Sequence, residues 1–463
     1  MATPALGAVL AGALPFVEAE VTSMSIPGTQ GSQDGFDYQL KDIHCTQFTI
    51  AASSVTSAPG AGLTIALGGM ALQCNADWNF QLHIWPHFPN GAGSVDISVT
   101  GTSATLGVLV TAAALHPRLV ASAVNLAIGN IDLTFNGSIL DWLLNLFKGY
   151  IEGQIRSGLT GAFSTAITTV IANQIDPALA AMPMAIPLSH APPPYNTAEV
   201  RFGLTDNPTF TAAYMAVDLQ GDVVPIADQR DPPIAPPALP PWTAASADYA
   251  VQLQLSSYTP ESALYAFYTA GALSWLLPPA DLPLGLNTTA GYALIAPGLP
   301  AAYPGRLVEM NASFAALPNM TFSPSGIAVA ALLRLDWIVL PANGSAPVTA
   351  FSLLAQTDFS GAIVARAANG TQPAALLASI AYINSTLATR NSTVGPVNTP
   401  LLQALVDDVF AGIIVPIVNA LFATGFPLPQ IGGVTLVAPA VIYNSGYVTV
   451  ASNFTFAPPS AGK

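Results

Sequence analysis

Two long segments of this chain repeat apolar residues at a spacing of about four, the pattern of a helix with one buried face. The first covers about residues 138–175 and the second about residues 400–424. Gly425 followed by Pro427 is a helix stop for the second segment. A shorter helix is expected over Glu261–Thr269. The pattern therefore predicts one long amphipathic helix in each half of the chain.

The apolar stripes of the two helices contain only large aliphatic and aromatic residues. The first stripe is Leu143, Phe147, Ile151, Ile155, Leu159, Phe163, Ile167 and Ile171, and the second is Leu402, Leu405, Val409, Ile413, Ile417 and Leu421. Lys148 and Arg156 fall off the first stripe. The second stripe lies in a long uncharged run that needs an apolar partner, which is a membrane, a large core or a bound lipid.

Much of the remaining chain alternates apolar and polar residues between Gly, Pro and Asn breakers, which is typical of β-strands. Thr49–Val55, Leu63–Leu67 and Val95–Thr100 are examples, and similar runs recur in both halves. Strands combined with one long helix in each half indicate an α+β fold with an internal duplication of architecture.

A proline-rich segment separates the two halves. Residues 230–241 read Arg-Asp-Pro-Pro-Ile-Ala-Pro-Pro-Ala-Leu-Pro-Pro, the composition of a semi-rigid linker. We therefore expect an N-terminal domain over residues 1–229 and a C-terminal domain over residues 242–463.

The strongest candidate for a membrane span is Leu401–Ala423. After Asp408 no charged residue occurs until Lys463. Pro416 and the Asp407-Asp408 pair interrupt this segment, however, and basic anchors are missing from its flanks. We therefore expect a buried helix rather than a spanning one.

Charge excludes some partners. The chain has 463 residues, of which 52% are hydrophobic and 8% charged, and its net charge is −14. An acidic chain is not expected to bind nucleic acid, nor anionic membranes by simple attraction. We expect no metal site, because His83 and His87 are separated by Trp85-Pro86 and would lie too far apart on a strand. The sequence contains no nucleophile elbow, phosphate loop or dinucleotide fingerprint, and we do not expect an enzyme.

Several features indicate the secretory pathway. Cys45 and Cys74 are the only cysteines, and they form either one disulfide or two buried thiols. The apolar Ala5–Val17 segment suits the core of a signal peptide, an amphipathic helix or a truncated start. Nine Asn-x-Ser/Thr sequons are candidate glycosylation sites: Asn136, Asn287, Asn311, Asn319, Asn343, Asn369, Asn384, Asn391 and Asn453.

Short motifs in a fixed order give the chain a family resemblance. They are Ile26-Pro27, Leu133–Gly137, Asp141–Phe147, then the proline-rich linker, Tyr265–Ser274, Leu286–Thr288, Ile295–Pro300, Tyr303-Pro304, Ile414–Asn419 and Gly425–Pro429. In this order they resemble the family of bactericidal/permeability-increasing protein, lipopolysaccharide-binding protein, and the cholesteryl ester and phospholipid transfer proteins. The resemblance extends over nearly the whole chain.

The resemblance implies an elongated boomerang of two barrels, each a twisted antiparallel sheet packed on a long helix, joined by a central antiparallel sheet. It also implies that each barrel holds phospholipid acyl chains in an apolar pocket, with no cofactor besides this ligand. Tyr265 is expected near the mouth of the C-terminal pocket. The other candidate lipid contacts are Leu143, Phe147, Ile151 and Ile155 in the N-terminal barrel, and Leu402, Leu405, Val409 and Ile413 in the C-terminal barrel. For each of them, ordinary core packing is the competing interpretation.

The expected function is a secreted or luminal lipid-binding or lipid-transfer protein that meets a membrane or lipid particle transiently. One alternative is an antibacterial protein that binds lipopolysaccharide, and a second is a structural surface glycoprotein with permanently bound lipid. The antibacterial members carry clustered cations at the tip of the first barrel. The cations of the first half are here only Lys41, Arg118, Lys148, Arg156, Arg201 and Arg230, which weakens the lipopolysaccharide interpretation.

Overall fold

The computed structural model describes most of the chain. The described residues are 28–33, 35–60, 62–82, 90–137, 141–189, 193–241, 249–283, 286–342, 345–368, 374–423, 425–428 and 434–456, with a few single positions between 6 and 22. The N-terminal segment around residues 5–17 and the residues 83–89, with His83, Trp85 and His87, thus lie largely or wholly outside the described part.

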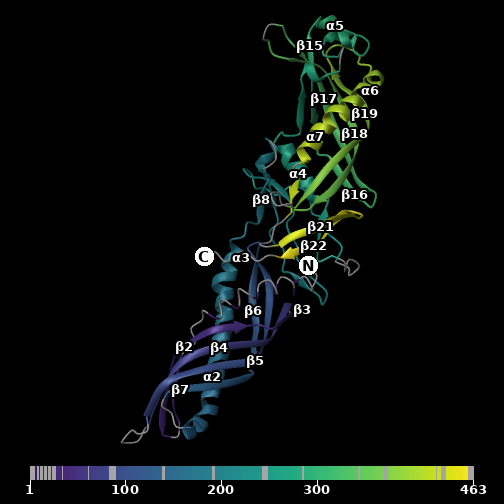
Figure 1. Ribbon diagram of the computed structural model, residues 1–463. Helices are drawn as coiled ribbons and strands as arrows, with labels where there is room; N and C mark the ends of the chain where they lie inside the picture. Colours follow the sequence, from purple (N-terminus) through teal and green to yellow (C-terminus); the bar gives the residue numbers. More distant parts are fainter. Residues whose placement is uncertain are drawn as a thin grey trace.

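The N-terminal half is one antiparallel sheet crossed by a long helix (Figure 1). Its strands are β1 (Thr29–Gln33), β2 (Phe36–Thr49), β3 (Ala52–Ala58), β4 (Gly62–Leu82), β5 (Asn90–Ala113), β6 (His116–Ala127) and β7 (Asn130–Gly137). The helix is α2 (Asp141–Val170), continued by a π-helical turn, η1 (Ile171–Ile175), and by α3 (Asp176–Ala180). The expected strand at Thr49–Val55 is confirmed only from Ala52, where β3 starts, because β2 ends at Thr49 and two residues separate the strands.

The C-terminal half repeats this plan at the opposite end of the elongated molecule (Figure 1). Its sheet contains β14 (Ser274–Leu277), β15 (Leu307–Phe314), β16 (Asn319–Ser323), β17 (Gly326–Leu340), β18 (Val348–Arg366), β19 (Ala375–Ser392) and β20 (Phe426–Pro427). Its long helix is α6 (Thr399–Val409), the π-helical turn η6 (Phe410–Ile414) and α7 (Val415–Phe422). The short α5 (Gly298–Ala302), η4 (Pro279–Asp281) and η5 (Thr289–Tyr292) complete this half.

Local sequence explains both ends of the second long helix. Asn398 is the N-cap of α6 and its side chain accepts a hydrogen bond from the backbone N–H of Leu401 at 3.4 Å. After α7, Gly425 has φ +79°, a conformation that favours glycine, and a Cβ there would meet Leu377 at 2.8 Å. The stop at Gly425 is therefore confirmed.

Small elements lie between the two large sheets. One small sheet is β8 (Ala185–Pro187), β9 (Ala198–Arg201) and β12 (Val223–Pro225); the other is β13 (Val251–Ser256), β21 (Val434–Tyr443) and β22 (Tyr447–Phe456). The hairpin β10 (Thr209–Phe210) and β11 (Met215–Ala216), η2 (Tyr195–Thr197) and α4 (Tyr258–Thr269) lie in the intervening sequence. In the described residues, two three-stranded antiparallel sheets therefore replace the single central sheet that we expected. The α+β class and the elongated two-part architecture are confirmed.

One described helix, Thr399–Phe422, is long and apolar enough to cross a membrane by length and composition alone. The core helix of a soluble protein passes the same test. In this structure the helix buries Leu402, Val406 and Phe410 completely or almost completely against the C-terminal sheet. The buried face contains Leu402, Val406, Val409, Phe410 and Ile414. The expected stripe therefore matches it at Leu402 and Val409, whereas Leu405 and Ile413 are only half-buried.

Candidate functional site

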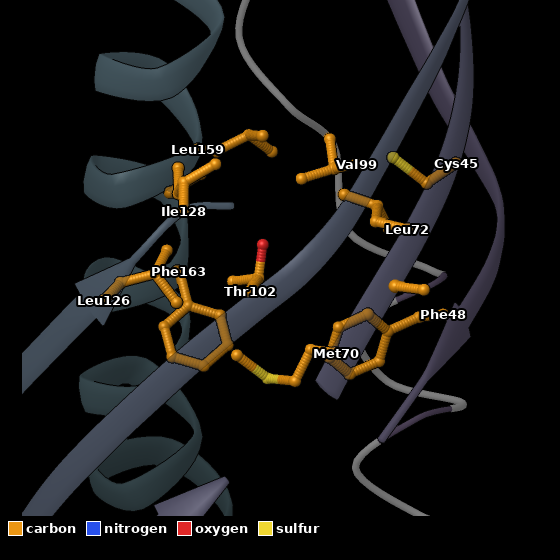
Figure 2. Close-up of a pocket in the computed structure, with 12 residues that line it drawn as sticks. Cys45, Phe48, Met70, Leu72, Val99, Thr102, Leu126, Ile128, Leu159 and Phe163 are labelled. Atoms are coloured by element: carbon orange, nitrogen blue, oxygen red, sulfur yellow. The ribbon is translucent and has the colours of Figure 1, made fainter. Parts of the chain in front are cut away.

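An apolar cavity lies between α2 and the N-terminal sheet (Figure 2). The centre of a water-sized sphere can reach a volume of about 50 Å³ inside it. The surrounding space without protein atoms, which includes open solvent, is about 550 Å³. Its walls come from β2, β4, β5, β6, the turn after β6, and α2. The lining residues are Cys45, Phe48, Met70, Ala71, Leu72, Val99, Thr102, Leu126, Ile128, Leu159, Ala162 and Phe163. The cavity therefore suits an apolar chain.

Backbone irregularities in two adjacent strands shape this cavity. The pairing of β4 with β5 shifts register on both sides of Met70, which is opposite Thr102. Gly69 in β4 and Gly101 in β5 both have positive φ, +62° and +68°. Glycine adopts this conformation without steric cost and is typical of a β-bulge. The two strands therefore bend together where the cavity opens between them and α2.

Two polar groups hold the turn between β6 and β7 at the edge of the cavity. The Oγ1 of Thr102 accepts a hydrogen bond from the N–H of Gly129 at 3.2 Å. The guanidinium of Arg156, on α2, donates to the carbonyl of Gly129 at 3.1 Å and to the carbonyl of Ile128. Arg156 is exposed and thus places a positive charge beside a lining residue.

The structure places two of the N-terminal candidates, Ile151 and Ile155, outside the lining of the cavity. Ile151 and Ile155 are each 7% exposed and pack in a core cluster with residues of the sheet such as Trp78. The wall of the cavity instead uses Leu159 and Phe163, further along the same helical stripe. The side chains of Leu143 and Phe147 lie outside what the structure describes. The apolar stripe continues through all these turns, so the sequence held no signal for the turn that borders a cavity.

The C-terminal candidates lie in or against a packed core. Leu402 and Val409 are 0% and 2% exposed, in one cluster with Trp337 and Phe351, whose rings stack at 4.8 Å. Leu405 and Ile413 are half-buried and pack against the same cluster. Their burial is explained by core packing, and a lipid contact at these positions stays a prediction.

The segment around Tyr265 lies at the junction of the two halves. Tyr265 is half-buried on α4, and α4 packs against β12 of the first half. Ala263 and Phe267 of α4 share a core cluster with Val223. The N–H of Val223 also donates to the Ser262 hydroxyl at 2.9 Å. Residues before and after the proline-rich segment therefore share one interface.

A buried ion pair strengthens this junction. The guanidinium of Arg201 on β9 donates to the carboxylate of Asp222, with Nε–Oδ1 at 3.0 Å, and also to Asp231 in the proline-rich segment. The Asp222 side chain is 4% exposed and that of Arg201 is 15% exposed. The hydrogen bond from Arg201 to Asp222 raises the pKa of Arg201 above its usual value. The hydroxyl of Tyr258 on α4 lies 3.5 Å from Asp222.

Polar groups also anchor the apolar C-terminal helix. The carboxylate of Asp407 accepts hydrogen bonds from the Gln403 amide at 2.7 Å, from the Ser385 hydroxyl at 3.0 Å and from the Tyr382 hydroxyl. Tyr382 and Ser385 lie on β19. Asp407, which interrupts the apolar segment in the sequence, thus fixes α6 to the sheet.

We expect the C-terminal half to lose stability in alkali. Burial, together with the hydrogen bond to Asp407, raises the pKa of Tyr382 to about 12. Burial also raises the pKa of Tyr292, whose oxygen accepts from the indole N–H of Trp337 at 2.9 Å. An unfolded tyrosine titrates near pH 10, so the stabilisation is complete below about pH 10 and is lost as the pH rises towards 12.

The measurement is the urea midpoint of unfolding between about pH 8 and pH 11.5. The decline above pH 10 should be shallower in Tyr382→Phe, which removes the ionising hydroxyl. An equal decline in wild type and variant would contradict this explanation. Tyr268→Phe is the matched control, because Tyr268 is 37% exposed.

Two further sequence features have structural counterparts. Cys45 and Cys74 face each other on β2 and β4 and are joined by a disulfide. Of the sequons in the described residues, Asn287 and Asn311 are half-buried and the others are exposed, namely Asn136, Asn319, Asn384, Asn391 and Asn453. Asn343 and Asn369 lie outside the described residues.

Across the described residues, no group of three or more His, Cys, Asp or Glu side chains is arranged to hold a metal ion.

Two antiparallel sheets, each packed on a long apolar helix, and a cavity with a largely apolar lining suit a class of protein that holds apolar ligands. The chain matches the family models for the N-terminal domain (residues 6–174) and the C-terminal domain (residues 195–456) of the LBP / BPI / CETP family. The chain therefore belongs to this family of lipid-binding and lipid-transfer proteins, and the resemblance seen in its sequence is confirmed.

Individual relatives agree with this assignment over nearly the full chain. A bactericidal permeability-increasing protein of Sebastes schlegelii is 23% identical, over 95% of this chain and 91% of its own length. The human lipopolysaccharide-binding protein is 22% identical, over 91% of this chain and 85% of its own length. A crystal structure of lipopolysaccharide binding protein matches with a TM-score of 0.58 at 20% identity and covers 97% of both chains, which shows a shared fold.

Proposed function

We propose that this protein binds phospholipid by an acyl chain in the N-terminal cavity and exchanges it with membranes or lipid particles. The observation that carries the proposal is the cavity itself. Its lining is apolar except for one threonine, and α2 contributes Leu159 and Phe163 of its apolar stripe to the wall. An acyl chain gains about 0.8 kcal/mol per methylene on leaving water. A bilayer offers nearly the same gain, so exchange between the cavity and a bilayer is close to balanced.

The rim of the cavity suits a phosphate headgroup. Arg156 is exposed there and lies one helical turn before Leu159 of the wall. A phosphate at this rim would meet a guanidinium, which is a strong partner for phosphate oxygens. The cavity has room for only a few water-sized spheres, so a whole chain requires side chains of α2 and the sheet to move apart.

The expected function is non-enzymatic and extracellular or luminal. The exposed sequons and the disulfide support a secretory-pathway location. We also propose domain boundaries at residues 229 and 242. The two domains share a packed interface, because Val223 of the first packs against α4 of the second. Lipid binding near Leu402 and Val409 is a second, separate proposal to be tested, although both residues pack in a core cluster.

The deciding experiment is mass spectrometry of lipid extracted from the purified, glycosylated protein, with stoichiometry, followed by transfer between labelled vesicles. About one phospholipid per chain that exchanges supports the N-terminal site. About two per chain supports both sites. Bound lipid that never exchanges would favour a structural glycoprotein, and a folded protein without lipid would overturn the proposal.

Lipopolysaccharide binding is the second candidate, because two of the relatives described above are named for binding lipopolysaccharide or permeabilising bacteria. Three of the first-half arginines are already paired with carboxylates: Arg118 with Asp176, Arg201 with Asp222, and Arg230 with Asp228. They are therefore poorly placed to bind phosphates of lipid A as a cluster. Salt-sensitive binding to lipid A vesicles would favour this candidate, since charge pairing weakens as salt rises.

A further inference from the structure

One polar side chain interrupts the hydrocarbon lining of the N-terminal cavity. Thr102 is 7% exposed, and its oxygen points into the space between Leu159, Val99 and Phe163 (Figure 2). As an acceptor, this hydroxyl is satisfied by the N–H of Gly129 at 3.2 Å. For its own hydrogen, the structure records no acceptor among the described residues. The hydroxyl is therefore a free donor that faces the cavity.

The backbone places Thr102 there by a specific device. On β5 the inward positions are Val95, Ile97 and Val99, which follow the two-residue period of a strand. Continued without a break, that period would turn residue 102 outward. The bulge at Gly101 shifts the alternation by one residue, so Thr102 and Ala104 become the inward positions. The bulge thus places a hydroxyl inside an apolar space.

Water is a poor partner for this hydroxyl. The cavity, at about 50 Å³, is large enough for water, but an ordered buried water makes two to four hydrogen bonds. Apart from Thr102, the side chains of the lining are hydrocarbon or sulfur. A donor left unpaired in such surroundings costs free energy, which a ligand oxygen at the right depth would recover.

We propose that Thr102 is a specificity residue that donates a hydrogen bond to an oxygen carried on the acyl chain of the bound lipid. This inference rests on the proposed function, that the cavity holds an acyl chain. Two chemical sources supply such an oxygen: the ester carbonyl at the head of a glycerolipid chain, and a hydroxyl along a hydroxylated chain. A plain hydrocarbon chain lacks the acceptor and is discriminated against.

The test compares matched lipid pairs on wild type, Thr102→Val and Thr102→Ser. One pair is a diacyl phosphatidylcholine and its dialkyl ether analogue of equal chain length; the other is a long fatty acid and its 3-hydroxy counterpart. Each pair competes for the protein at equal concentration, and bound lipids are quantified by mass spectrometry. Wild type should prefer the member with the additional acceptor, the ester carbonyl or the 3-hydroxyl, in at least one pair by roughly 3–10-fold, as expected for one hydrogen bond.

The variants separate this role from a structural one. Thr102→Val also removes the acceptor for the Gly129 N–H and is expected to lower stability, but a preference ratio is independent of the folded fraction. The ratio should fall to about one in Thr102→Val and persist in Thr102→Ser. A preference for the ester identifies the carbonyl as the partner; a preference for the 3-hydroxy acid identifies the chain hydroxyl.

Three outcomes would overturn the inference. Wild type that binds both members of each pair equally would refute it and leave the proposed lipid-binding function intact. An undiminished preference in Thr102→Val would assign the selectivity to another group. Wild type that binds none of the four lipids would overturn the proposed function, and this inference with it.

Discussion

Replacing Ala162 with tryptophan is expected to remove most bound lipid from the N-terminal cavity. Ala162 is half-buried on α2 and lines the cavity beside Phe163. An indole at this position would occupy the space that an acyl chain needs. We expect the lipid bound at this site to fall by roughly tenfold or more, which corresponds to a loss of at least about 1.4 kcal/mol of binding free energy.

The measurement is the molar ratio of extracted lipid to protein, with vesicle transfer as a second readout. Overpacking a core costs about 1–3 kcal/mol, so thermal unfolding must show that the variant is folded. Ser157→Trp is the matched control, because Ser157 is an exposed position of the same helix. A folded Ala162→Trp protein with its full lipid content would locate the lipid elsewhere, with the C-terminal helix as the next candidate.

Replacing Arg201 with methionine is expected to give the largest loss of stability at the junction of the two halves. The change leaves the Asp222 carboxylate buried, and its remaining partner among the described residues is the Tyr258 hydroxyl at 3.5 Å. Removing one partner of a buried ion pair typically costs about 3–5 kcal/mol, because the remaining charge is uncompensated. The free energy of unfolding from urea titration is the measurement.

Arg230→Met provides the control for the same type of substitution. Arg230 pairs with Asp228 on the surface, where ion pairs contribute little, and we expect no measurable change. The double variant Arg201→Met with Asp222→Asn should recover part of the loss, since no unpaired charge remains. Equal stability of Arg201→Met and wild type would show that water reaches Asp222 and that the pair is not a structural element of the junction.

The engaged cations and the cavity together favour a carrier of neutral or zwitterionic lipid over a receptor for bacterial lipopolysaccharide. The net charge of −14 opposes docking to anionic membranes by simple attraction. Apolar burial, in contrast, involves no charge pair and is not weakened by screening. Vesicle transfer that is insensitive to ionic strength would therefore agree with the lead proposal.

The sequence by itself determined the elements that have a strong local pattern. The spacing of apolar residues predicted both long helices, and Gly425 marked the end of the second because only glycine readily adopts its positive φ. The order of short motifs predicted the family and hence the elongated α+β fold. Strand ends were less certain, since β4 and β5 run far beyond Leu63–Leu67 and Val95–Thr100.

Only the tertiary structure decided where the candidate site lies. Ile155 and Leu159 belong to one stripe and look equivalent in the sequence, but the first packs on the sheet and the second borders a cavity. The cavity coincides with the bulges at Gly69 and Gly101, where the pairing of β4 with β5 shifts register. Thr102 would face outward by simple alternation, and it turns inward because one extra residue in β5 reverses the faces of the strand. That reversal depends on how two strands pair, which no local pattern of residues encodes.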